Sequence, residues 1–299
     1  MLSLLKSKLK QEKCQSNESQ TQDASWNPKA IAQPVPVSIS FQVQESSALC
    51  LPSFRVPSLD SVFYVPGFLS AEESSCLFQN ISNGIYNHNW VSLPKSQRRL
   101  LRFGGEVTPQ GLDLVEELPL WCQELGRSLD QRIGMGVLGF GKEGNEGKEL
   151  NHALVNEYEK GIGIMPHSDG PLYFPVVCII SLGSSCSFNF YENYGKYKEE
   201  ESAGRLFIEE GSLLVFRGKC YEEYLHTIPD SIVDEMIIWK DEKEEYQSSY
   251  VNFKQTKFFK ENEEQIASEI EKEGIFSKSI PRSKRISITL RHVFPKSQF

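Results

Sequence analysis

Seven short β-rich runs between residue 150 and the C-terminus constrain the fold more than any other feature of this sequence. Gly, Ser and charged residues separate the runs, and strands of this length and spacing are typical of an all-β sandwich or barrel. The runs are HALVNEYE (152–159), VVCIISLG (176–183), SFNFYE (187–192), RLFIEE (205–210), SLLVFRG (212–218), EYLHTI (223–228) and RISITLR (285–291). We therefore expect a mainly β fold of this kind.

Helices are expected before the β-rich region. Ser70 and Glu73 form a capping box, which predicts a helix from about residue 71 to residue 81. A strand is predicted just before this helix, at 61–65. Leucines and a tryptophan recur at helical spacing over 112–126, which predicts a second helix there.

The first 55 residues differ in composition from the rest of the chain. They are rich in Gln, Ser, Asn and Pro and too polar to pack a core. We therefore expect a disordered N-terminal extension over 1–55, followed by one domain over 56–299. A transit peptide is the alternative for the basic and apolar start, MLSLLKSKLK, although this start contains no arginine and Glu12 follows it closely.

An acidic insert interrupts the β-rich region at about 240–275. Between 240 and 274 it holds ten acidic residues and six lysines, so its net charge of −4 is half of the chain's −8. Such a charge run is typical of a solvated surface. Within it, NEEQIASEIEKEG (262–274) predicts a surface helix that ends at Gly274.

Cysteine usage and hydropathy limit the class of protein. The seven cysteines are scattered, odd in number and form no CxxC pair, which is typical of reduced thiols inside a cell and argues against structural zinc. No apolar run approaches the roughly 18 residues that a membrane span needs. We expect a monomer of the cytoplasm and nucleus that has no membrane partner.

A candidate metal-binding pair, His167 and Asp169, lies in NEYEKGIGIMPHSDG (156–170). Residues i and i+2 of an extended segment point the same way, and non-haem Fe(II) oxygenases hold iron by two histidines and one carboxylate. The pair alone is a weak signal, because short motifs occur by chance and the stretch also fits an ordinary strand and turn. A third ligand must come from a later strand. Only His226 and His292 follow, and His226 lies in a strand-like run.

Seven positions in the same order resemble the AlkB family of Fe(II)/2-oxoglutarate dioxygenases. They are Asn156, Tyr158, Gly161, Ile164, His167 with Asp169, His226, and the run RISITLR. The resemblance covers about residues 59–239 and 282–293. It implies a double-stranded β-helix (jelly roll) with N-terminal helices packed on it, and Fe(II), 2-oxoglutarate as cosubstrate and O2. It also implies that His167, Asp169 and His226 are the iron ligands.

The resemblance further assigns the residues that hold 2-oxoglutarate. Arg285 matches the arginine that binds the far carboxylate, for which a planar, permanent cation offers two parallel hydrogen bonds. Asn156 and Tyr158 match side chains that hydrogen-bond the cosubstrate, and Arg291 matches one that steadies the near carboxylate or the aspartate ligand. Ser287 stands where the family has asparagine, so we expect a weaker contact there. Without the motif, Arg285 would be interpreted as an ordinary ion-pair residue, and Tyr158 and His226 as ordinary core residues.

The region at about 86–111 matches the substrate-recognition lid of the family. From 74 to 105 the sequence has no acidic residue, and its four cations are Lys95, Arg98, Arg99 and Arg102. Aromatic residues are interleaved with them, as in sites that hold a single-stranded phosphate backbone and a stacked base. A solubilising surface is the alternative, and a pI near 5.4 argues against a strongly DNA-binding surface.

These observations favour a dioxygenase that oxidatively demethylates an N-methylated base in single-stranded RNA or DNA, with RNA the favoured partner. Two alternatives stay open. One is a dioxygenase acting on a protein substrate, which the acidic insert favours. The other is a nucleic-acid-binding adaptor with little turnover, against which the complete set of expected ligands and Arg285 argue.

Overall fold

The computed structural model describes residues 41, 49–82, 86, 89–139, 149–192 and 202–296. Most of the predicted disordered extension (1–55) lies outside these residues. Its described end forms the 3-10 helix η2 (Leu51–Phe54) and the start of β1 (Arg55–Val56). Leu51 is fully buried, so folded structure begins before the predicted boundary at residue 56.

All seven predicted β-rich runs form strands. They are β7 (His152–Tyr158), β9 (Val176–Leu182), β10 (Cys186–Glu192), β11 (Gly204–Ile208), β12 (Leu213–Arg217), β13 (Tyr224–Ile228) and β17 (Arg285–Arg291). The jelly roll has an eighth strand, β8 (Ile164–His167), which is not among the seven predicted runs because it is short and contains a proline.

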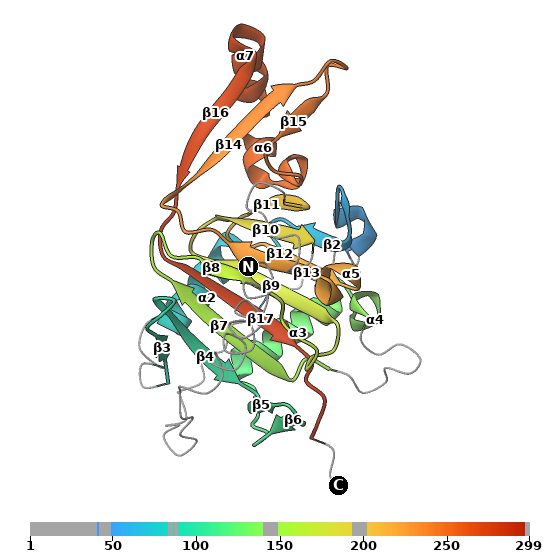
Figure 1. Ribbon diagram of the computed structural model, residues 1–299, viewed down its shortest axis with the longest axis vertical. Helices are drawn as coiled ribbons and strands as arrows, with labels where there is room; N and C mark the ends of the chain where they lie inside the picture. Colours follow the sequence, from blue (N-terminus) through green and yellow to red (C-terminus); the bar gives the residue numbers. More distant parts are fainter. Residues whose placement is uncertain are drawn as a thin grey trace, which may run out of the picture.

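Eight strands form the two facing sheets of a jelly roll (Figure 1). One sheet has the order β12-β9-β17-β7 and the other the order β11-β10-β13-β8, with antiparallel neighbours throughout. Apolar side chains from both sheets fill the space between them, among them Val177, Phe188, Phe190 and Leu214. The fold class is therefore the expected one, a mainly β double-stranded β-helix.

The first sheet extends beyond the jelly roll at both edges. Its added strands are β1 and β2 (Leu59–Val65) beyond β12, and β4 (Arg98–Phe103) and β3 (Val91–Leu93) beyond β7. β5 (Glu106–Thr108) and β6 (Gly111–Asp113) form a separate antiparallel pair. Much of the region expected to form a lid, 86–111, therefore belongs to these strands, and β4 lies directly against β7 of the jelly roll.

Two helices cover the outer face of the large sheet (Figure 1) and bury apolar residues in one cluster with it. α2 (Ala71–Ser82) begins at the expected capping box. The Glu73 N–H donates to Ser70 Oγ at 3.1 Å, and the Ser70 N–H donates to the Glu73 carboxylate at 2.8 Å. The second helix, α3 (Leu120–Arg132), completes this layer.

The helix prediction over 112–126 is wrong about its first turns. Leu112 is buried in β6, where its N–H donates to the Phe294 carbonyl at 2.8 Å, and α3 starts only after Pro119. Proline is common at a helix start because its missing N–H would have no partner there. Two short helices are α4 (Met135–Leu138) and α5 (Lys219–Glu222). No helix in the described part of the chain is long and apolar enough to cross a membrane.

The acidic insert forms most of an arm, residues 233–281, that projects from the jelly roll (Figure 1). Its elements are β14 (Val233–Lys240), β15 (Tyr246–Ser248), η3 (Phe253–Gln255), α6 (Lys257–Glu261), α7 (Glu263–Glu273) and β16 (Ile275–Pro281). The predicted helix over 262–274 is confirmed, and Gly274 ends it with a φ of +76°. The interpretation of the insert as a solvated surface applies only to the outer side of the arm. Inside, the arm buries an apolar cluster that includes Met236, Tyr250, Ile266 and Phe276.

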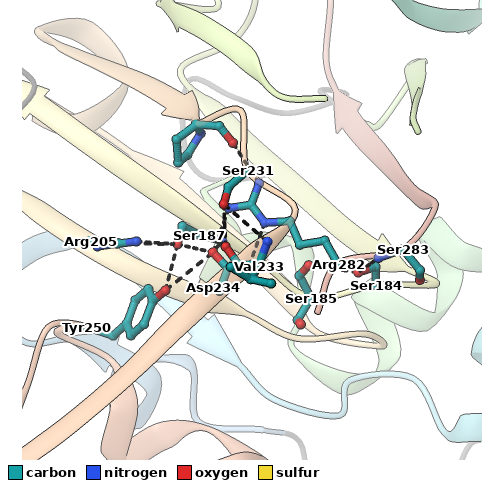
Figure 2. A network of polar contacts seen from close by, with 11 residues as sticks. Ser184, Ser185, Ser187, Arg205, Ser231, Val233, Asp234, Tyr250, Arg282 and Ser283 are labelled. Atoms are coloured by element: carbon teal, nitrogen blue, oxygen red, sulfur yellow. Dashed lines mark hydrogen bonds and ion pairs between the residues drawn. The ribbon is translucent and has the colours of Figure 1, made fainter. Parts of the chain in front are cut away.

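A buried polar network ties the arm to the jelly roll (Figure 2). The Asp234 carboxylate of β14 accepts from Arg282 Nε and Nη2, each at 2.7 Å, and from the Ser187 N–H of β10 at 3.0 Å. The Tyr250 hydroxyl lies 2.8 Å from Ser187 Oγ, and Arg205 Nη2 of β11 donates to the same oxygen at 3.1 Å. Asp234 and Arg282 are 1% and 5% exposed, so water does not screen this ion pair.

Removing the Asp234 carboxylate should destabilise the protein strongly. The change Asp234→Ala leaves the buried Arg282 without its charged partner, and such a loss lowers the free energy of unfolding by about 3–5 kcal/mol. Urea denaturation followed by circular dichroism measures it. Glu235→Ala is the matched control, because among the described residues this neighbouring carboxylate bonds only the exposed Ser279, and its loss should cost less than about 0.5 kcal/mol. Equal losses in the two variants would contradict this role of the network.

Candidate metal centre and cosubstrate pocket

The pairing of β8 with β13 brings the three expected iron ligands together. His226 of β13 is the direct partner of His167 at the end of β8, and their ring centroids lie 4.2 Å apart. Asp169 follows His167 by two residues. One ligand atom from each of the three residues lies within 4.8 Å of the others. Two imidazole nitrogens and a carboxylate oxygen are the donor set of a non-haem Fe(II) centre, so the residues fit this metal.

Neighbouring groups orient both histidines. His167 Nδ1 lies 2.8 Å from the Met165 carbonyl oxygen. A carbonyl can only accept, so Nδ1 carries the proton and Nε2 keeps its lone pair for a metal. The His226 ring stacks on Phe188 at 5.3 Å with an angle of 10° between the ring planes. Both rings are therefore fixed by contacts outside the metal position.

The electrostatic environment keeps the three ligands in the protonation state that binds metal. Burial, followed by the charge of His167, lowers the pKa of His226 to about 3. Burial also lowers the pKa of His167. Burial alone would raise the pKa of the Asp169 carboxyl, but Arg291 and the two histidines outweigh it and lower this pKa. Neutral imidazoles and a carboxylate are what a metal ion requires.

Arg291 holds one oxygen of the aspartate, as its place in the motif implies. Its Nη1 donates to Asp169 Oδ1 at 3.0 Å. The other oxygen, Oδ2, is buried and has no hydrogen-bond partner among the described residues. That oxygen is therefore the one free to bind a metal.

Arg285 fits the far carboxylate of 2-oxoglutarate. The side chain is 3% exposed, and its Nη2 donates to Ser181 Oγ at 2.8 Å. Its Nε and Nη1 are buried without a partner in the part of the chain that the structure describes. A buried guanidinium with two unpaired donors is stable only beside an anion, and its planar shape suits a carboxylate.

The remaining cosubstrate residues line the same cavity as Arg285 and the three expected metal ligands. Tyr158 is the register partner of Arg285, and Asn156 is the partner of Ser287. The Arg285 guanidinium carbon lies 5.4 Å from the Tyr158 ring centroid. Asn156, Tyr158 and Ser287 are all buried in the wall of the same cavity. Strand alternation puts them on one face, as the sequence motif requires.

The structure does not place the four cations of the basic window on one surface. Arg98 is buried and donates to Asn156 Oδ1 at 2.9 Å, so it belongs to the cosubstrate wall. Arg99 points to the opposite face of β4, where it pairs with Glu157 at 2.6 Å. Arg102 lines the cavity and Lys95 is exposed in the turn before β4. The expectation that all four track one phosphate backbone is corrected accordingly, because residues on a strand alternate between faces.

A single cavity of about 460 Å³ contains this site. Arg285, Tyr158 and Asn156 line it together with the three expected ligands, and it also reaches Glu106 and Val107 of β5. Its volume falls within the range of about 300–1,000 Å³ that is usual for small-molecule sites. The cavity therefore has room for a second molecule beside a five-carbon cosubstrate.

Sequence reasoning missed three residues of this cavity region. Ser181, which accepts from Arg285, lies in an apolar run where nothing marks it. Tyr173 follows the metal motif in a loop, and its ring lies 3.9 Å from the guanidinium carbon of Arg291. His152 precedes Asn156 by four positions on β7, so the alternation that selects Asn156 and Tyr158 selects His152 as well.

Comparison with known proteins identifies the family. The model of the 2OG-Fe(II) oxygenase superfamily matches residues 61–291, which is most of the chain, so the chain belongs to this superfamily. It is 32% identical over 240 residues to a protein of Danio rerio named probable RNA/DNA demethylase ALKBH6, covering 78% of this chain and 86% of that protein. At this identity and coverage the chain is a member of the AlkB family, as its motifs imply.

Two further likenesses concern more distant proteins. The chain is 28% identical over 240 residues to the uncharacterized protein L905 of Acanthamoeba polyphaga mimivirus, covering 80% of this chain and 88% of that protein. The solved structure of OsALKBH1 aligns with a TM-score of 0.45 at 14% identity, over 78% of this chain and 96% of that one.

The protein is thus a non-haem dioxygenase that uses Fe(II), 2-oxoglutarate and O2. Bound Fe(II) would supply the chemistry by which O2 oxidises a C–H bond of the substrate, coupled to the conversion of 2-oxoglutarate to succinate and CO2. The chain's own residues bind and orient the metal and the cosubstrate. His167, Asp169 and His226 would hold the metal, Arg291 fixes the aspartate, and Arg285 would hold the far carboxylate.

Proposed function

We propose that this protein oxidatively demethylates an N-methylated base in single-stranded RNA or DNA. Hydroxylation of the N-methyl group gives an N-hydroxymethyl group, which releases formaldehyde and leaves N–H. One O2 and one 2-oxoglutarate are consumed, and succinate and CO2 are produced. A base must leave its helical stack to enter such a cavity, and a single strand makes this exit least costly.

The observation that carries this proposal is the extent of the cavity. Beyond the part lined by Arg285 and Tyr158, it continues past the metal ligands to Arg102, Tyr173 and Glu106. An aromatic ring and a cation at that end suit a flat base attached to a phosphate backbone. The demethylase name of the zebrafish relative supports the same substrate class.

Succinate release distinguishes this proposal from a protein substrate. Pools of methylated single-stranded RNA, methylated single-stranded DNA and methylated peptides would be compared at equal concentration, with formaldehyde as the second product. We expect either nucleic-acid pool to stimulate succinate release above the substrate-free rate. Stimulation by the peptides alone would overturn the proposal in favour of a protein substrate, and binding of nucleic acid without any turnover would favour the adaptor.

The salt dependence of binding tests the basic window in its corrected form. Only Lys95 and Arg102 remain candidates for phosphate contacts, since Arg98 is buried against Asn156 and Arg99 pairs with Glu157 on the opposite face of β4. Changing both to Gln should flatten the log–log salt slope of single-strand binding by about 0.7 for each lost contact. Lys243→Gln, an exposed lysine of the arm, is the control with the same kind of charge change. An unaltered slope in the double variant would show that these cations do not contact phosphate.

A further inference from the structure

His152 is a buried histidine at the start of β7 that neither the metal centre nor the cosubstrate pocket uses. Its side chain lines the cavity, as do those of Leu154, Asn156 and Tyr158 at alternate positions of the strand. The residue is 2% exposed, and neither ring nitrogen has a hydrogen-bond partner among the described residues. Buried polar groups in folded proteins nearly always have a partner, so this imidazole points to a ligand.

Two arginines flank His152 on the neighbouring strands. Arg291 is its register partner on β17, and Arg102 of β4 lies on the other side of β7. Burial, followed by the charges of Arg291 and Arg102, lowers the pKa of His152 to about 3. The ring is therefore neutral at physiological pH, with one nitrogen that donates and one that accepts.

Tyr173 provides an aromatic surface next to His152. The two ring centroids lie 6.0 Å apart, and the rings are tilted by 45°. The Arg291 guanidinium carbon lies 3.9 Å from the Tyr173 centroid, and the Tyr221 hydroxyl donates to the Tyr173 carbonyl at 3.1 Å. Contacts on two sides therefore hold Tyr173 in place. A planar ring with hydrogen-bonding edges fits this pair of side chains.

The charges around the cavity disfavour a cationic guest. Its charged lining residues in the described part of the chain are Arg98, Arg102, Arg285, Arg291, Glu106 and Asp169. The two positive charges of Fe(II) and the two negative charges of 2-oxoglutarate cancel, so the loaded cavity keeps an excess of two positive charges from its lining. Repulsion between like charges is strongest where water is excluded.

We propose that the substrate is a base whose N-methyl group leaves it uncharged, and that His152 hydrogen-bonds this base to select it. The inference rests on the proposed function, because it names the class of methylated base for the same cavity. An uncharged base presents neighbouring donors and acceptors that a neutral imidazole can match. A base with a positive ring would meet the excess positive charge and would lack a lone pair where it is methylated.

Two oligonucleotides of one sequence test this selectivity, one containing N6-methyladenine and the other 1-methyladenine. The two bases differ only in the position of the methyl group, which is on the exocyclic nitrogen in N6-methyladenine and on a ring nitrogen in 1-methyladenine. Only 1-methyladenine carries a positive charge at neutral pH. Binding to the protein loaded with Mn(II) and 2-oxoglutarate would be measured by fluorescence anisotropy without O2, so that no turnover interferes. We expect N6-methyladenine to bind on the order of tenfold tighter, the effect of one good hydrogen bond.

Variants separate a selecting role of His152 from a structural one. His152→Leu should bring the ratio of the two dissociation constants close to one, whereas His152→Gln, which keeps a donor and an acceptor, should preserve most of it. His292→Gln is the matched control, because this buried histidine lies outside the cavity with its Nδ1 2.7 Å from the Glu149 carbonyl. A merely structural defect would weaken both oligonucleotides alike and leave the ratio unchanged.

Each outcome bears on a different statement. Equal or tighter binding of 1-methyladenine, or a parental ratio in His152→Leu, would overturn the inference and leave the proposed function intact. Failure of both methylated strands to bind more tightly than the unmethylated strand would overturn the inference together with the proposed function. The inference is supported if the ratio of the two dissociation constants falls close to one in His152→Leu but stays near the parental value in His152→Gln.

Discussion

Replacing His226 with alanine should abolish stoichiometric Fe(II) binding and all turnover. His226 lies directly opposite His167, and with Asp169 these residues bring three ligand atoms within 4.8 Å of one another. Loss of a partner behind a metal ligand already lowers metal affinity about 10- to 100-fold, so loss of a ligand should exceed this. Anaerobic titration with Fe(II), followed by measurement of bound iron, gives the stoichiometry. His167→Ala and Asp169→Ala should behave in the same way.

The same experiment contains its own controls. His292→Ala removes a histidine that lies outside the cavity, and this variant should still bind one equivalent of iron. Far-ultraviolet circular dichroism should show the parental fold in all variants, because all three ligands line the cavity. Full iron occupancy in His167→Ala, Asp169→Ala and His226→Ala would show that the metal centre lies elsewhere.

Replacing Arg285 with alanine should raise the 2-oxoglutarate requirement steeply. A buried carboxylate that loses its charged partner costs about 3–5 kcal/mol, which corresponds to a rise in the dissociation constant of roughly 10²- to 4 × 10³-fold. Calorimetric titration of 2-oxoglutarate into the Mn(II)-loaded protein measures this directly. Iron binding should not change, because the three expected ligands come from other elements.

Two further variants sharpen this prediction. Arg285→Lys should also bind 2-oxoglutarate weakly, because a point charge cannot replace the two parallel hydrogen bonds of a guanidinium. Lys284→Ala is the control at the adjacent position, where the side chain pairs with Glu159 at 2.6 Å and is 37% exposed. A parental 2-oxoglutarate affinity in Arg285→Ala would mean that this carboxylate binds to a different cation.

Local sequence was sufficient for most of the jelly roll. Strands β7 and β17 could be predicted because alternation of inward and outward side chains is a property of adjacent residues. The start of α2 could be predicted because Ser70 and Glu73 satisfy each other's N–H groups within one turn. The short strand β8 was not among the seven predicted runs, since four residues including a proline are too few to show the period of a strand.

The basic window shows what local sequence could not supply. Arg98 and Arg99 are neighbours in the chain, but one bonds Asn156 in the cavity and the other pairs with Glu157 on the opposite face, in each case 58 residues away. Which of the two faces the cavity depends on the register between β4 and β7. A shift of one residue would exchange them, and packing of both faces of the sheet selects the register.

By itself, the sequence determined seven strands of the jelly roll and the candidate residues of the iron and 2-oxoglutarate site, since spacing along single strands and the order of the motifs carry that information. Only the tertiary structure decided the partners of the polar groups. It buried Asp234 against Arg282, and it left His152, between Arg102 and Arg291, without a hydrogen-bond partner among the described residues. Those environments arise where strands distant in the chain pair, and the burial that results makes an unpaired charge or imidazole costly.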